Sequence, residues 1–359
     1  MVATGPMQNA KGIWIGFFAI LTLISASALA DAPASSVPTA APVPVAELAA
    51  TCPDASLGET AADCPWADVA RAISALPAED QGNPFTVYKM IPQAIRTQLR
   101  KDAKNDGLKS LWGRSINFDE LAHGEIVNPA ILDVLHKAFR VPARQGRIFH
   151  AGTEHTYGYL FSNLRTAYGY KRARWVIPEI EAGFALPTGT ISPIPHEGTL
   201  FANVAALAGK IAFRNDPAAL KVLHRSWGGA AQAVRDFSIA DLPIRRLEET
   251  VRFADSGRTV VLRTDIVPFT HVPTAHADGT PFTGDAAVLI YSVLDSEEQT
   301  AQLISMFPVA ASFGATVFAP ANLGDAKPII TRYNAYVEGV YNSATPLTGL
   351  RQEVNPAQP

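Results

Sequence analysis

The sequence predicts an α+β protein, with a helical N-terminal part followed by a largely antiparallel β-sheet domain. Between residues 51 and 142, apolar side chains recur with the spacing of helices. From about residue 143, apolar and polar side chains alternate with a period of two, which is typical of strands. There is no internal repeat and no clear βαβ alternation, the pattern that would indicate a parallel sheet. We therefore expect a helical region at 51–142, a mixed α+β functional domain at 143–350 and a tail at 351–359.

Residues 1–30 have the pattern of a signal peptide. Lys11 precedes the apolar run "IWIGFFAILTLI", and Ala28 and Ala30 are the small residues that a signal peptidase requires. The run is about a dozen residues long, too short to span a bilayer comfortably. A retained membrane anchor is the alternative. We expect cleavage after Ala30, a periplasmic or secreted protein, and no integral membrane span after processing.

The next segment, residues 31–50, is rich in alanine and proline and is expected to be an extended linker. Cys52 and Cys64 follow it and are the only cysteines in the chain. In an oxidising compartment two such cysteines most simply form a disulfide, which would stabilise the fold by roughly 3 kcal/mol. The alternatives are two free thiols or a metal-binding pair. A disulfide would exclude a nucleophilic cysteine.

Several segments carry clear local signals. Helices are expected at 65–76, at 91–107, at 128–142 with Asn128 as the N-cap, and at 219–227. His136 is expected on the surface of the third of these. Strands are expected at 259–269, at 328–337, and as a pair within 286–309 joined by a polar turn. A helix at 296–307 is the alternative to the second strand of that pair, and 244–253 is ambiguous.

The formal net charge of −3 excludes a polyanion binder that acts by bulk electrostatics. Positive charge is instead concentrated between residues 140 and 175, where Glu154 is the single acid. The basic residues there are Arg140, Arg144, Arg147, Arg165, Lys171, Arg172 and Arg174.

If "YGYKRARW" is a strand, one face presents Tyr168, Tyr170, Arg172 and Arg174. Such a face could bind an anionic or ring-bearing small molecule or polymer, because arginine binds phosphate or carboxylate and tyrosine stacks on rings. A solvated outer face is the alternative.

The same window holds the main catalytic candidates, His150, Glu154 and His155, in "HAGTEHTYGY". Their spacing matches no helical zinc motif, and Gly152 argues against a helix, so we expect a strand or turn with the histidines on opposite faces. A histidine and a glutamate can perform acid–base catalysis without a metal. A structural role for either histidine is the alternative.

A proline-rich loop adds a second pair of candidates, His196 and Glu197. A further loop contains His271, His276 and Asp278, whose spacing matches no known structural metal site. No nucleophile elbow and no glycine-rich phosphate loop is present in the sequence.

The combination favours an exported hydrolase that acts without a metal on an anionic or carbohydrate-like substrate. His150 or His155, with Glu154, His196 or Glu197, would perform the acid–base chemistry, and Arg172 and Arg174 would stabilise charge. No cofactor is expected. The alternatives are a non-enzymatic periplasmic protein that binds a ligand or the cell envelope, and a metallohydrolase. The sequence leaves the oligomeric state open.

Overall fold

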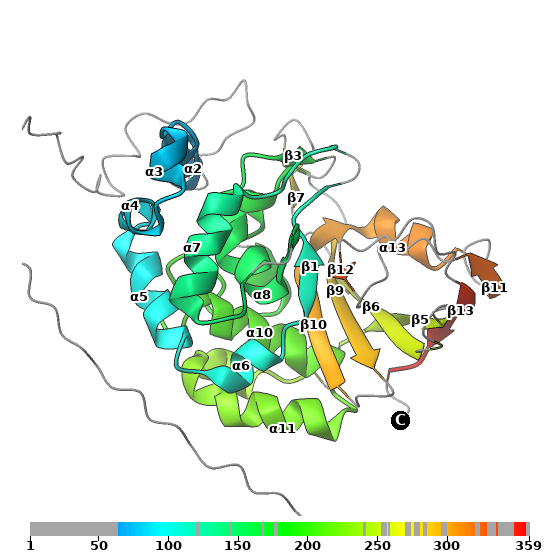
Figure 1. Ribbon diagram of the computed structural model, residues 1–359. Helices are drawn as coiled ribbons and strands as arrows, with labels where there is room; N and C mark the ends of the chain where they lie inside the picture. The colour runs from blue at the N-terminus through cyan, green and yellow to red at the C-terminus, as the bar shows by residue number, and fades with distance from the viewer. Residues whose placement is uncertain are drawn as a thin grey trace, which may run out of the picture. The chain divides into compact units, whose positions relative to one another are not determined.

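Figure 1 shows the computed structural model of the chain. The residues that it describes are 64–119, 122–143, 146–166, 169–175, 179–239, 242–252, 257, 259–269, 274–275, 281–282, 286–295, 300–319, 324–328, 335–336 and 348–356. The expected signal peptide and linker lie outside these residues. So do Cys52, Tyr168, His271, His276 and Asp278.

The N-terminal part is helical, as predicted. Its helices are α2 (Cys64–Ser74), α3 (Ala78–Gln81), α4 (Pro84–Met90), α5 (Gln93–Asp102), α6 (Asp106–Ser110) and α7 (Pro129–Phe139). The Asn128 side chain caps α7 by accepting a hydrogen bond from the backbone N–H of Ala130 at 2.9 Å. The expected surface position of His136 is wrong. Its ring is buried against Phe149, with 5.3 Å between the ring centroids.

Helices continue well beyond residue 143. They are α8 (Ala151–Thr153), the π-helical turn η2 (Glu154–Gly158), the 3₁₀ helix η3 (Lys171–Trp175), α9 (Glu179–Gly183), α10 (Leu200–Ala212), α11 (Pro217–Ser226), η4 (Trp227–Gly229) and α12 (Gln232–Asp236). The helix expected at 219–227 is therefore confirmed. The period-two prediction is wrong for the other helices between residues 151 and 236. Helix α10 is buried on all sides, so its sequence lacks the amphipathic pattern that identifies a surface helix.

The C-terminal part contains a six-stranded antiparallel sheet in the order β10-β9-β6-β5-β13-β11. Its strands are β5 (Arg245–Arg252), β6 (Thr259–Phe269), β9 (Ala286–Asp295), β10 (Thr300–Ala310), β11 (Gly324–Pro328) and β13 (Thr348–Val354). The predicted α+β class and the predicted strands at 259–269 and within 286–309 are confirmed. The alternative helix at 296–307 is wrong, and the ambiguous segment 244–253 forms β5.

A three-stranded sheet, in the order β12-β1-β2, lies beside the edge strand β10. It consists of β1 (Arg114–Ile116), β2 (Ile148–His150) and β12 (Ala335–Tyr336). A parallel bridge between Trp112 and Leu303 links the segment before β1 to β10. The single strand expected at 328–337 is wrong, because Pro328 belongs to β11 and Ala335 to β12, in different sheets. Two short hairpins complete the strands: β3 (Arg165–Thr166) with β4 (Gly169–Tyr170), and β7 (Thr274–Ala275) with β8 (Pro281–Phe282).

Both faces of the large sheet are covered. Helix α10 contacts β10, β9 and β6 on one face, where Val267 joins the main hydrophobic core. Helix α13 (Ala311–Val317) contacts β9 and β10 over a second apolar cluster that includes Ile266 and Leu289. Because Ile266 and Val267 are adjacent on a strand, they point to opposite faces.

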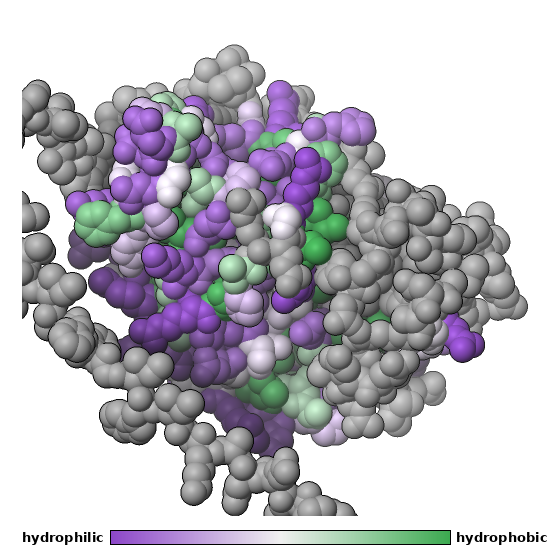
Figure 2. Space-filling model, in the orientation of Figure 1, coloured by the Kyte–Doolittle hydropathy of each residue, from purple (hydrophilic) through white to green (hydrophobic). Residues whose placement is uncertain are grey.

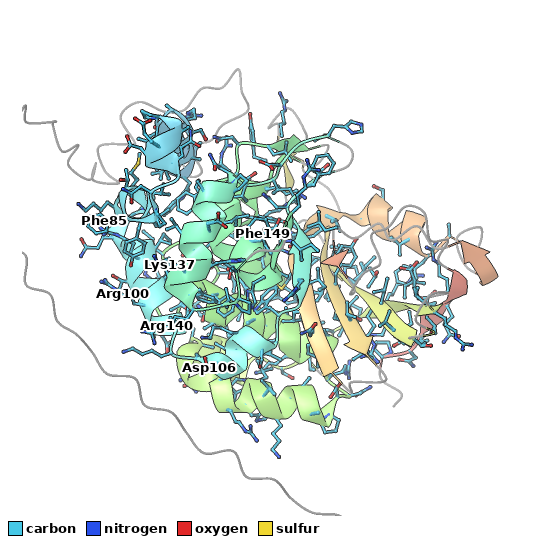
Figure 3. All side chains as sticks on the ribbon, viewed as in Figure 1. Phe85, Arg100, Asp106, Lys137, Arg140 and Phe149 are labelled. Atoms are coloured by element: carbon cyan, nitrogen blue, oxygen red, sulfur yellow. The ribbon has the colours of Figure 1, made fainter. Side chains whose placement is uncertain are left out.

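Apolar side chains lie in the core, and most charged side chains lie on the outer faces of the helices. Figure 3 shows Phe149 between α7 and β1, whereas the labelled Arg100 and Lys137 lie on exposed positions of their helices. In Figure 2 the viewed surface around α5 and α6 is largely hydrophilic. The catalytic candidates Glu154 and His155 are therefore positioned in the interior, between the helices and the edge of the large sheet.

Candidate acid–base site

Two backbone irregularities meet at His155. Residues Glu154–Gly158 form a π-helical turn, which widens the helix by one residue, and such turns are frequent at functional sites. Strand β10 has a bulge between Leu303 and Ser305, which places Ile304 outside the regular ladder. The Ile304 backbone acts on His155 as a hydrogen-bonding neighbour and raises its pKa, against the larger lowering effect of burial. Bulges of this kind often redirect groups beside active sites.

The side chains of Glu154 and His155 form a buried pair that is incompletely hydrogen-bonded. Glu154 is fully buried and His155 is 3% exposed. The Ser115 hydroxyl donates to Glu154 Oε2, and His155 Nε2 lies 3.7 Å from the same oxygen. Glu154 Oε1 is buried and makes no hydrogen bond within the part of the chain that the structure describes, whereas the ring of His155 has only the Ile304 backbone as a hydrogen-bonding neighbour there, outside good hydrogen-bond geometry. Most buried polar atoms have a hydrogen-bond partner, so a buried atom without one is a candidate contact for water or a ligand.

Burial keeps both members of the pair neutral near pH 7. It raises the pKa of Glu154 to about 8, against the opposing effect of the nearby Lys171 cation. It lowers the pKa of His155 to about 3, and Lys171 lowers that pKa further. At neutral pH the site therefore holds a protonated carboxylic acid beside an unprotonated imidazole. The first can donate a proton and the second can accept one.

A cationic group from η3 and an aromatic group at the end of the π-helical turn η2 lie next to this pair. Lys171 Nζ lies 3.6 Å from Asp119 Oδ2 and 5.6 Å from the ring centroid of Tyr159. That tyrosine ring is tilted against His155, with 4.7 Å between the centroids. Burial lowers the pKa of Lys171 to about 8, and the neighbouring Arg174 lowers it further. The pair therefore lies beside a lysine cation whose charge is partly balanced by Asp119.

The structure corrects the predicted tyrosine–arginine face. Residues 171–175 form a 3₁₀ helix and not a strand, so Tyr170, Arg172 and Arg174 do not alternate on one exposed face. Arg172 is buried, donates to the Ser162 carbonyl at 3.0 Å, and lies 3.7 Å from the centroid of the Tyr170 ring. Arg174 is also buried and donates to the Pro308 carbonyl at 2.9 Å, on the edge strand β10. Both arginines thus bind backbone.

His150 lies nearby but has a different environment. Its Nδ1 accepts a hydrogen bond from the Thr153 N–H at 3.1 Å and so caps α8, while Nε2 lies 3.0 Å from the Lys109 carbonyl. Burial lowers the pKa of His150 to about 4. With both nitrogens occupied, this ring fixes the start of the helix that carries Glu154. The expected strand or turn is confirmed for His150, which ends β2, and is wrong for His155, which lies in the π-helical turn.

His196 and Glu197 are exposed residues of the loop before α10, apart from the buried pair. The His196 backbone N–H donates to the Gly189 carbonyl at 3.0 Å, and Glu197 Oε1 lies 4.0 Å from Arg235. The structure thus brings Glu154 and His155 together and leaves His196 and Glu197 at another position. Ser115, Tyr159 and Asp119 were not among the predicted site residues.

A second buried polar cluster starts from the same π-helical turn. The Tyr157 hydroxyl donates to Asp102 Oδ2 at 2.7 Å, and the Thr199 hydroxyl donates to Asp102 Oδ1 at 2.7 Å. Burial raises the pKa of Asp102 to about 7. Since both of its carboxyl oxygens are hydrogen-bonded, this cluster connects α5, the turn and the start of α10.

Other predictions concern groups that the structure describes only in part. Cys64 is buried at the start of α2, but Cys52 lies outside the described residues, so the disulfide stays a prediction. Within the described ranges, no three His, Cys, Asp or Glu side chains gather into a metal-ligating group. No helix among those residues is long and apolar enough to cross a membrane.

Comparisons of the chain with protein-family models, with curated proteins and with solved structures found no match. The fold defines the class as α+β, and a fold class alone does not define a function.

Proposed function

We propose that the protein is an exported hydrolase in which Glu154 is the general acid and His155 the general base. The observation that carries this proposal is the buried acid–imidazole pair around Glu154 Oε2, in which Glu154 Oε1 has no hydrogen-bond partner among the described residues. The reaction proposed uses no metal.

The chemistry suits a buried site because it leaves the net charge of the pair unchanged. Glu154 would protonate the leaving group while His155 removes a proton from the attacking water. The products are a glutamate anion and a histidinium 3.7 Å apart, which attract one another in a low-dielectric interior. Transfer of the proton from His155 back to Glu154 restores the starting state.

The surroundings favour an anionic or carbohydrate-like substrate. Lys171 acts electrostatically on both Glu154 and His155. A lysine cation beside the pair would stabilise a substrate anion or an anion that develops in the transition state. Since the pair is buried, the proposal also requires an opening motion that admits the substrate.

The decisive test is a hydrolysis assay on the purified protein with RNA, DNA, acidic glycan and peptidoglycan fragments, each with and without EDTA. On any substrate cleaved, Glu154→Gln and His155→Asn should each lower kcat about 100-fold or more. Activity should persist from about pH 4 to 7 and fall near pH 8, because Glu154, with its pKa of about 8, loses its proton there. Glu79→Gln and His224→Asn, on exposed helical positions, are the controls.

Full activity in both the Glu154→Gln and His155→Asn variants would overturn the assignment. Loss of activity in EDTA would favour the metallohydrolase, and binding without cleavage would favour the ligand-binding alternative. Export is tested separately by N-terminal sequencing of the processed protein, which should begin at Asp31. The Cys52–Cys64 disulfide should appear in a non-reducing peptide map.

A further inference from the structure

We infer that Ser115 is a positioning residue that holds Glu154 by one carboxyl oxygen, Oε2, so that the other oxygen, Oε1, meets the reacting atoms. This inference rests on the proposed function and assigns a role to a residue in a separate part of the chain. Ser115 and Glu154 are 39 positions apart.

Ser115 is well placed to orient another side chain. It is the central residue of β1, and β1 is the middle strand of its sheet, with Ser115 paired to Phe149 on one side and Ala335 on the other. The residue is fully buried. A backbone held on both sides leaves the hydroxyl little freedom, and such rigid support is what a precise catalytic geometry requires.

The hydrogen bond distinguishes the two oxygens of Glu154. Oε2 accepts from Ser115 and is the oxygen nearest to His155 Nε2, whereas Oε1 has no hydrogen-bond partner in the described part of the chain. A neutral carboxyl group has one proton and one carbonyl oxygen. Because Oε2 is used as an acceptor, the geometry assigns the proton to Oε1, from which it can be donated to a substrate.

Removing the Ser115 hydroxyl should change how Glu154 titrates. A hydrogen bond to a carboxylate favours its charged form, so its loss raises the pKa of Glu154 further. The other groups that act on this carboxyl are His155 and Tyr159 on the same helix and Lys171 on η3. They are unchanged in a Ser115 variant, so the shift would report on the serine.

The test is an infrared titration of the full-length protein, with the Glu154 band identified as the protonated carboxyl signal that Glu154→Gln removes. In Ser115→Ala, the band should move to higher frequency and titrate at higher pH. In Ser115→Thr, which keeps a hydroxyl, it should stay near the wild-type position. Ser162→Ala is the matched control, because Ser162 is equally buried but donates to the Ile126 carbonyl.

Enzyme kinetics distinguish the role of Ser115 from the proposed hydrolase function. On a cleaved substrate, Ser115→Ala should lower kcat about tenfold with little change in KM, and its basic pH limit should rise. An unchanged band and pH limit in Ser115→Ala would overturn the role of Ser115 even if Glu154→Gln is inactive. A fully active Glu154→Gln enzyme would instead overturn the proposed function, whatever the infrared band does.

Discussion

Glu154 and Asp102 are both buried carboxyl groups, but their hydrogen bonds give them different roles. Asp102 accepts from two hydroxyls, one on each oxygen, whereas Glu154 keeps Oε1 unpaired within the described residues. A satisfied buried network stabilises a fold, and an unsatisfied atom is available to a ligand. We therefore interpret Asp102 as a structural residue and Glu154 as a catalytic one. The same π-helical turn contributes to both, through Tyr157 and Glu154.

The pKa of Asp102 leads to a prediction about stability. Burial raises this pKa from 3.8 to about 7, so the fold favours the protonated form. The stabilisation is fully present below about pH 4 and is lost as pH rises through about 7. Asp102→Asn removes this titration. Its unfolding free energy should fall less steeply between those pH values than that of the wild type, with a difference on the order of 2–4 kcal/mol.

Urea denaturation at several pH values measures that difference. Glu154 contributes a slope of the same sign up to about pH 8. The lowered pKa values of His136, His150 and His155 act in the opposite direction, because their stabilisation is lost as pH falls below about 6.5. The comparison of variant with wild type cancels these shared contributions. Parallel curves for the two proteins would contradict the prediction.

For single residues, the sequence could identify site residues that are neighbours in the chain. Glu154 and His155 were predicted as site residues because they are adjacent and lie in a basic window. Ser115 could not be predicted, since no local pattern records a hydrogen bond to a residue 39 positions away. The burial of His136 against Phe149 and the hydrogen bond from Arg172 to the Ser162 carbonyl likewise depend on contacts between separate segments.

Among the elements, α8 shows how packing overrides local preference. Gly152 argued against a helix, yet it lies within α8. A Cβ atom at Gly152 would lie 2.5 Å from Trp112 Cγ and 2.6 Å from Phe201 Cε2. The glycine allows the helix to approach these two rings closely, and that requirement outweighs its low helix propensity.

Gly152→Ala should therefore destabilise the protein by about 1–3 kcal/mol through overpacking, despite the better helix propensity of alanine. Thermal unfolding measures the effect. Gly228→Ala is the matched control, because a Cβ at that glycine of η4 meets nothing within 4 Å. A Gly152→Ala protein as stable as this control would show that the aromatic rings can move aside at no cost.

Periodicity predicted the amphipathic elements and failed for the others. Helix α7 buries one face, so its apolar residues repeat with the period of a helix. Strand β6 alternates between buried and half-buried residues from Thr259 to Thr264, which gives it a period of two. Helix α10 is buried all round, and the π-helical turn and η3 are too short or irregular to show a period. The site lies on these irregular elements, which is why its backbone was predicted wrongly.

At the scale of the whole molecule, a buried ion pair joins the helices to the sheet. Arg246 on β5 binds Asp265 on β6 through two hydrogen bonds, of 2.7 and 3.0 Å. The same guanidinium donates to the carbonyl of Ala212, the last residue of α10, at 2.8 Å. The pair thus connects the central strands to the helix that covers them.

Arg246→Met should destabilise the protein by about 3–5 kcal/mol, because it leaves Asp265 buried without its partner. The double variant Arg246→Met/Asp265→Leu should recover part of that loss. Arg245→Met, which removes the exposed pair with Glu353, should cost no more than about 1 kcal/mol. Chemical denaturation compares the three. Equal effects for Arg246→Met and Arg245→Met would contradict a special role for the buried pair.

The position of strand β13 determines when the large sheet can form during synthesis of the chain. It lies between β5 and β11, and its Glu353 pairs with Arg245, 108 positions earlier. While the ribosome is still making the intervening residues, the outer edge of β5 has no β13 to pair with. The sheet can be completed only after the residues up to Val354 have been synthesised. Until then the edge of β5 is open to pairing with strands of other chains, so the nascent protein depends on protection of that edge.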